Sequence, residues 1–372
     1  MTHMREENAE STENIKDTES DQQAELEQEQ ELQLSPEVIA MTGVLKLNKD
    51  LKAAVKLMSP REVRYLVDTY YSFQKVRIRA GNQEKALTKS EEPHEVLKWL
   101  RMNGQYLESQ IAAALAVYAQ EQRLCRWVMS IKGLKHILAC GLYANLDLNR
   151  AFTASHIWRF CGLDPSSVWL GSEKGEKLVN KHIATGLEGM PLIAAVALEL
   201  HRKAEYVERD CIHNAKFNKR KTWNHEDLRK VAALCPYTRT MKVICWKIGS
   251  SFNMLSDPEN KLPPERKSFY GNMLLIRHAE MKALNYSGGM KEKADAALAA
   301  GRYKKVAVIK VLKEGRMPDG WVFGTAKRIV VKTFLFHYYQ RGRELMGLPW
   351  VKPYSIAHKD HADFIEAPPM VD

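Results

Sequence analysis

The fold is decided by the stretch Ser130-Ile-Lys-Gly-Leu-Lys-His-Ile-Leu-Ala139, which joins two segments with helical spacing of apolar residues. Residues 120–129 precede it, and apolar residues from Ile137 onward recur three or four positions apart, as they do on one face of a helix. Gly133 lies in the middle of the connection, where the missing Cβ permits a tight turn. The stretch therefore predicts two helices joined by a glycine turn, the pattern of a helix-hairpin-helix.

The start of the second helix is the predicted binding element. The first backbone N–H groups of a helix have no partner inside it and attract anions. Lys132, Gly133, Leu134, Lys135 and His136 surround this end, so the hairpin is expected to hold a nucleic-acid backbone without reading bases. Many helix pairs with a glycine turn only pack a core, and a purely structural role stays open.

Charge is distributed unevenly along the chain. The net charge is +11, but residues 1–37 hold twelve acidic and two basic residues. The remaining chain therefore holds 54 basic and 33 acidic residues, a net charge of +21. Such a basic body favours polyanions, with binding that weakens as salt rises. A basic surface that is merely solvated is the alternative.

Composition also indicates the compartment. The six cysteines show no Cys-x-x-Cys spacing and are expected to be reduced core residues. No apolar leader and no long uncharged stretch is present, so we expect a cytoplasmic protein with no membrane partner.

The pattern along the chain predicts a mainly α, multi-helix fold with the hairpin at its centre. Five parts are expected: a disordered acidic tail at 1–34, a helical region at 35–130, a hairpin domain at 131–255, a basic helical region at 256–348, and an irregular tail at 349–372.

Local signals refine this division. Ser35-Pro36-Glu37 and Ser59-Pro60-Arg61-Glu62 have the form of helix starts, with serine as N-cap and proline at the first helical position. Residues 81–93 are expected to be a linker, and residues 166–182 a polar loop that contains Trp169. Val306–Val311 has a strand-like composition, but its flanks favour a helix. Further helical segments are expected at about 191–218, 224–234, 236–252, 265–285, 290–313 and 324–346.

The hairpin and the residues after it resemble the C-terminal domain of the insertion-sequence one-ten class transposases, the RNA-bridged DNA recombinases. The similarity lies in Ile131-Lys-Gly-Leu-Lys135, in Leu142 to Asp147, and in Phe152-Thr-Ala-Ser-His-Ile-Trp-Arg-Phe-Cys-Gly-Leu-Asp-Pro165. A weaker match is Pro236-Tyr-Thr-Arg-Thr-Met-Lys242. The wider sequence also resembles phage and bacterial proteins grouped with these transposases. The resemblance implies a role in DNA transposition or recombination, with DNA as partner and structured RNA as a second candidate.

The sequence also departs from that family. Its members begin with a ribonuclease-H-like domain whose acidic residues hold metal ions, whereas residues 35–125 here show helical spacing and no buried strand ending in aspartate. We therefore expect no cofactor and no metal, with magnesium needed only if the chain is catalytic. The family's serine nucleophile lies in a basic loop. In this chain Ser172 is the best candidate for it, because Lys174 and Lys177 come shortly after it in the sequence and could supply positive charge. No base for it can be assigned.

Other candidate groups are weaker. His358 and His361, or Cys211 with His213, lack the spacing of a known zinc site. A last basic cluster could bind phosphates or form a solvated face. Its members are Lys327, Arg328 and Lys332, with Arg341 and Arg343 further along.

The sequence thus predicts a DNA-binding protein of the transposase lineage that holds the backbone without sequence specificity. An active serine recombinase and a helical protein–protein adaptor are the alternatives, and enzymatic activity and homo-oligomer formation are left open. The residues expected to contact DNA are Lys132, Gly133, Leu134, Lys135, His136, Arg159, Lys174 and Lys177.

Overall fold

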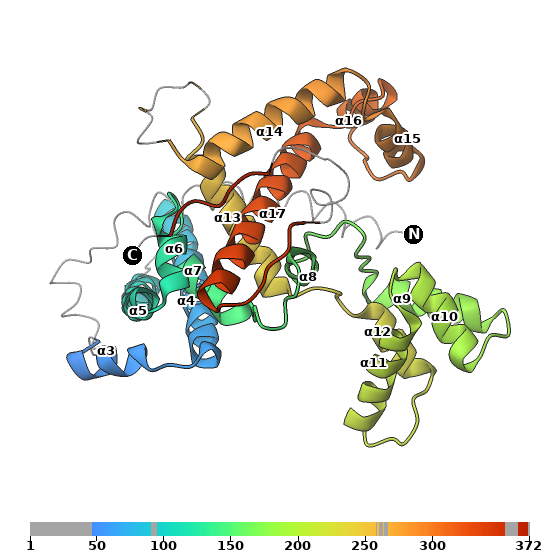
Figure 1. Cartoon of the computed structure of the whole chain (residues 1–372), viewed down its shortest axis with the longest axis horizontal. Coiled ribbons are helices and arrows are strands. Elements are labelled where there is room, and N and C mark those ends of the chain that lie inside the picture. The colour runs from blue at the N-terminus through green and yellow to red at the C-terminus, as the bar shows by residue number, and fades with distance from the viewer. Residues whose placement is uncertain are drawn as a thin grey trace. The chain divides into compact units, whose positions relative to one another are not determined.

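A computed structural model describes residues 47–90, 95–257, 259, 263, 267–353 and 364–370. These residues form fifteen helices, α3 to α17, joined by turns and loops and without a strand, which confirms the mainly α fold (Figure 1). The expected tail at 1–34, the helix start at Ser35 and the pair His358 and His361 lie outside the described residues. None of the fifteen helices combines the length and apolarity needed to cross a membrane.

The chain divides into two compact units that are each discontinuous in sequence. Unit 1 contains the described residues up to Arg126 together with Lys135–Ala144, and unit 2 contains Trp127–Leu134 and the residues from Asn145 onward. The chain therefore changes unit within α6 (Arg123–Ser130), just before α7 (His136–Asn145) and again before the last residue of α7.

Unit 1 is built on a pair of long helices. The pair consists of α4 (Pro60–Lys89) and α5 (Glu95–Glu121). Unit 1 also contains α3 (Lys49–Lys56), the start of α6 and most of α7. α4 begins as expected: Ser59 is its N-cap, and the Glu62 carboxylate accepts hydrogen bonds from the backbone N–H and hydroxyl of Ser59. These hydrogen bonds lower the pKa of Glu62.

The expected linker at 81–93 is wrong over most of its length, because α4 continues to Lys89. Gly81, the first residue of that range, lies inside α4, where a glycine costs about 1 kcal/mol relative to alanine. Packing against α5 outweighs that cost: the Arg101 Nε atom lies 2.6 Å from the Glu84 Oε2 atom and joins the two helices. Closer to the core, Arg77 Nε lies 2.7 Å from Oε2 of Glu108, whose side chain is fully buried.

Unit 2 contains a small bundle of four helices around an apolar cluster that includes Leu178, Val179, Leu192 and Val231. The bundle consists of α9 (Gly171–Ile183), α10 (Gly189–Glu199), α11 (Ala204–Phe217) and α12 (His225–Ala233). The polar loop expected at 166–182 is therefore wrong from Gly171 onward. Its two buried residues with apolar side chains, Leu178 and Val179, give too little apolar periodicity to predict a helix from the sequence, and α12 packs against them in the structure.

The helix expected at 191–218 is broken in two. α10 ends at Glu199, and α11 begins at Ala204. His201 adopts a positive φ of 53° between them, which ends the first helix. The helix expected at 290–313 is likewise two helices, α15 (Lys291–Ala299) and α16 (Val306–Lys313), separated at Gly301 with φ of 60°. Val306–Val311 is helical, as its flanks indicated.

The rest of unit 2 is organised by α17 (Asp319–Leu345), which packs against three other helices (Figure 1). Those helices are α8 (Ala154–Phe160), α13 (Arg239–Met254) and α14 (Phe269–Tyr286). Their common core is aromatic: Phe334 of α17 stacks on Trp127 and meets Phe252 and Tyr270 edge to face.

Two arginines near the end of α17 stabilise the fold. Arg343 is buried and donates to the carbonyl oxygens of Leu148, Ala151 and Pro349. Arg341 donates to the carbonyls of Ala367 and Pro368. Neither guanidinium is therefore free to act as the phosphate ligand that the sequence left open.

Candidate nucleic-acid interface

The glycine turn is present where the sequence places it. Gly133 has a φ of 91°, and the backbone N–H of Leu134 donates to the carbonyl of Ile131 at 3.0 Å. A Cβ on Gly133 would lie 2.5 Å from Cδ1 of Leu255 and 2.7 Å from Oγ of Ser251. The Ser251 hydroxyl donates to the Gly133 carbonyl. Glycine is thus needed both for the turn and for close contact with the end of α13.

The hairpin side chains differ in what they offer an anion. Lys132 and Lys135 are exposed, while Leu134 is buried. Burial, with a smaller effect of Lys135, lowers the pKa of His136, so its imidazole is neutral at neutral pH. The positive charge near the glycine turn therefore comes from Lys132 and Lys135, which belong to different units because the division falls between Leu134 and Lys135.

Two of the segments that carry the transposase resemblance, 152–165 and 236–242, contact each other in unit 2. Gly162, at the end of α8, has a φ of 68°, and a Cβ there would lie 2.8 Å from ring atoms of Tyr237. The backbone N–H of Thr238 donates to the carbonyl of Phe160 at 2.9 Å. The end of α8 is thereby fixed against the start of α13, which begins at Arg239.

Cations lie on aromatic rings at this junction. Nζ of Lys242 lies 4.3 Å from the centre of the Tyr237 ring and donates to the Tyr237 hydroxyl at 2.9 Å. The Arg239 guanidinium carbon lies 4.9 Å from the centre of the Trp169 ring, which meets Tyr237 edge to face at 6.3 Å. The indole N–H of Trp169 donates to the carbonyl of Ala233 at 3.2 Å.

α17 adds further cations beside α8. Nζ of Lys332 lies 5.3 Å from the centre of the Trp158 ring, whose N–H donates to the Lys332 carbonyl at 3.0 Å. Burial lowers the pKa of Arg328 and of Lys332. Asp164, beside Gly162, acts on the Lys332 ammonium in the opposite direction and raises its pKa.

We call this region the basic–aromatic surface; it comprises Arg239, Lys242, Arg328, Lys332, Trp158, Trp169 and Tyr237. None of its four cations forms an ion pair with a side chain in the described part of the chain. Other exposed lysines of unit 2 do form such pairs, namely Lys177 with Glu173, Lys181 with Glu199 and Lys230 with Glu226. The surface therefore keeps cations that no ion pair neutralises next to aromatic rings.

The remaining candidate residues lie on α8 and α9. Arg159 is exposed in the last turn of α8, and Lys174 is exposed in the first turn of α9. Lys177 forms an ion pair with Glu173 one turn earlier in α9. Ser172 is exposed, and its hydroxyl forms no hydrogen bond with any described residue. The structure thus brings no base to this serine among the residues that it describes. Those residues also include no group of three or more His, Cys, Asp or Glu side chains placed to hold a metal ion.

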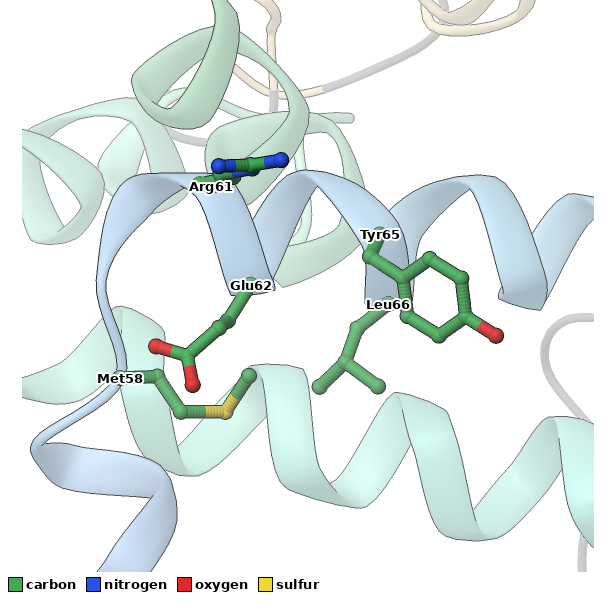
Figure 2. Close-up of a pocket in the computed structure, with 5 residues that line it drawn as sticks. All are labelled: Met58, Arg61, Glu62, Tyr65 and Leu66. Carbon is green, nitrogen blue, oxygen red and sulfur yellow. The ribbon is translucent and has the colours of Figure 1, made fainter.

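A shallow pocket in unit 1 has a different character. Figure 2 shows its lining at the start of α4, with Arg61 on the side of the helix opposite to Glu62 and Leu66. The Glu62 carboxylate is already occupied by the N-cap of the helix. Met58, Leu66 and Tyr65 make the rest of the lining mainly apolar, so it lacks the clustered cations that an anion needs.

The sequence predicts two separate groups within the basic–aromatic surface. Arg328 and Lys332 belong to a basic cluster near the end of the chain, and Tyr237, Arg239 and Lys242 belong to the weaker match at 236–242. The surface arises because α8 brings the two groups together, and no local signal carries that contact. No protein-family model matches the chain, and searches of curated proteins and of solved structures gave no match either.

Proposed function

We propose that this chain is a DNA-binding protein of the transposase lineage that holds the DNA backbone without sequence specificity during transposition or recombination. The observation that carries the proposal is the basic–aromatic surface of unit 2, where Arg239, Lys242 and Lys332 each lie on an aromatic ring and none of the four cations forms an ion pair with a described side chain.

The arrangement suits phosphates for an electrostatic reason. A lysine paired with glutamate must give up that partner before it binds a phosphate. Arg239 loses only a ring contact, and Lys242 loses a ring contact and a neutral hydrogen bond to the Tyr237 hydroxyl. Each phosphate that a cation neutralises releases condensed counterions, which favours binding at low salt. Burial lowers the pKa values of Arg328 and Lys332, and the negative charge of a phosphate nearby would favour their charged forms.

The same features support backbone contact over base reading. Sequence is read in a groove by bidentate hydrogen bonds, from arginine or lysine to guanine and from asparagine or glutamine to adenine. Here Arg239 and Lys242 lie on the rings of Trp169 and Tyr237, and cations beside rings position a backbone or stack on bases of any kind. The exposed lysines of the hairpin, Lys132 and Lys135, would extend backbone contact in the manner that the resemblance implies.

Three double variants with equal loss of charge test the proposal. Arg239→Gln/Lys242→Gln alters the basic–aromatic surface, and Lys132→Ala/Lys135→Ala alters the hairpin. The matched control, Lys230→Gln/Arg277→Gln, removes two exposed or partly exposed cations that are each paired with a glutamate. Binding of duplex DNA is measured over a series of salt concentrations.

Each lost phosphate contact lowers the slope of log affinity against log salt by about 0.9 for duplex DNA. The surface variant is therefore expected to lose about 1.8 units of slope, and the control to keep the wild-type slope. An equal loss in all three variants would mean that only net charge matters. A surface variant with unchanged affinity and slope would refute the assignment of this surface, and wild-type protein without salt-dependent binding would refute DNA binding itself.

A further inference from the structure

Trp169 is held in place and yet remains open to solvent. Its indole N–H donates to the Ala233 carbonyl at the end of α12, and its ring contacts both Arg239 and Tyr237. Despite these contacts, 45% of its surface is exposed. A tryptophan used only to pack the 167–170 segment against α12 would be expected to bury its ring, because a large aromatic surface gains most from burial.

The cation beside Trp169 is free to exchange partners. Arg239 is exposed and forms neither a hydrogen bond nor an ion pair with any described residue, so the Trp169 ring is its contact. A guanidinium that stacks on a ring can move to a phosphate at small cost, since both contacts are made at the protein surface. Lys242, at hydrogen-bond distance from the Tyr237 hydroxyl, is a second cation at the same place.

We infer that Trp169 stacks on an unpaired base, while Arg239 and Lys242 bind the phosphates beside that base. The inference rests on the proposed function and names its preferred substrate: single-stranded DNA, or a junction that exposes unpaired bases. Bases inside a duplex present only their edges and are stacked on one another, so the ring has nothing to stack on there. An aromatic ring beside a positively charged groove is the arrangement by which proteins hold single strands without regard to sequence.

Two substitutions of Trp169 distinguish stacking by its ring from the hydrogen bond of its indole N–H. Trp169→Phe and Trp169→Leu both lose the indole hydrogen bond to Ala233, so any effect on local folding that comes from that bond is shared. Only the phenylalanine variant keeps an aromatic face. Tyr206→Ala is the control for loss of an exposed ring elsewhere, because Tyr206 on α11 is 47% exposed and carries Arg209 at 5.1 Å from its centre.

Affinity of the full chain is measured for a single-stranded oligothymidine and for a duplex of equal length. Trp169→Leu is expected to bind the single strand about fivefold or more weakly than Trp169→Phe does, which corresponds to the lower end of measured base stacking. The two variants should bind the duplex equally, with the same dependence on salt, and Tyr206→Ala should match the wild type on both DNAs.

Equal affinities of the two Trp169 variants for the single strand would overturn the inference, as would an equal loss on single strand and duplex. Wild-type protein that binds the duplex but not the single strand would also overturn it, while leaving the proposed function intact. If the wild type binds neither DNA, the proposed function fails and the stacking inference fails with it.

Discussion

A buried histidine makes unit 2 sensitive to acid. His337 lies in α17 with no exposed surface, and Nδ1 is 2.8 Å from the Tyr270 hydroxyl, while Nε2 is 2.9 Å from the carbonyl oxygen of Ile365. A carbonyl only accepts, so Nε2 carries the proton and Nδ1 accepts from the tyrosine. Both nitrogens of the neutral ring are thus satisfied, and a second proton would have to displace the Tyr270 donor.

Burial lowers the pKa of His337 from 6.5 to about 4, with a smaller contribution from Arg341, while the hydrogen bond to Ile365 acts in the opposite direction. In the unfolded chain the group takes up its proton near its ordinary pKa, whereas in the folded chain it does so only near the lowered value. Below pH 6.5 the unfolded state therefore binds more protons, and stability falls as the pH falls toward 4. A difference of about 2.5 pKa units corresponds to roughly 3 kcal/mol of unfolding free energy.

The matched variant is His337→Gln, whose amide donates and accepts but does not titrate. Urea unfolding is followed by tryptophan fluorescence for both proteins between about pH 7 and pH 4. Other titrating groups change the free energy of unfolding equally in both proteins. Between pH 7 and pH 4 the wild type should therefore lose roughly 3 kcal/mol more unfolding free energy than the variant. Parallel pH profiles would refute the reasoning, and so would a His337 NMR resonance that titrates near its ordinary pKa.

Three further predictions follow from features of the fold and the site. Gly133→Ala should destabilise the protein by more than Gly288→Ala in thermal unfolding. Both positions have a positive φ, which costs alanine about 1–2 kcal/mol, but only at position 133 would the added Cβ clash with neighbouring atoms. Equal losses of stability in the two variants would contradict the close contact between the turn and α13. Arg77→Met should cost about 3–5 kcal/mol by leaving Glu108 buried and unpaired, and adding Glu108→Leu should recover most of the loss in the same assay. No DNA strand cleavage is expected from the wild type with magnesium or manganese, and covalent protein–DNA adducts that vanish in Ser172→Ala would overturn this.

The parts of the fold that the sequence predicted are those with local causes. Ser59 and Pro60 set the start of α4 through neighbours within one turn, and Gly133 sets its turn through its own backbone. The parts that it missed depend on distant partners. α9 is a helix because α12 covers Leu178 and Val179, and Trp169 belongs to the surface through Ala233, Tyr237 and Arg239.

The candidate site divides in the same way. Lys132 and Lys135 are predicted from a local pattern, a glycine turn just before the start of a helix, and both are exposed in the structure. The same pattern gave no sign that burial favours the neutral form of His136 or that Lys177 is paired with Glu173. Those properties depend on packing and on side-chain contacts, which spacing along the chain does not report.

The interleaving of the two units has a consequence for synthesis on the ribosome. Trp127 is the first long-range anchor of unit 2, yet its ring stacks on Phe334, and its N–H donates to Pro368, 241 residues later. Protein synthesis adds about 5–20 residues per second, so Pro368 is made roughly 12–48 s after Trp127. Meanwhile unit 1 can close as soon as α7 has emerged. We therefore expect a nascent chain in which unit 1 is folded while Trp127, next to it in sequence, is still exposed. Such an exposed apolar side chain is a binding site for chaperones until the last segment is made.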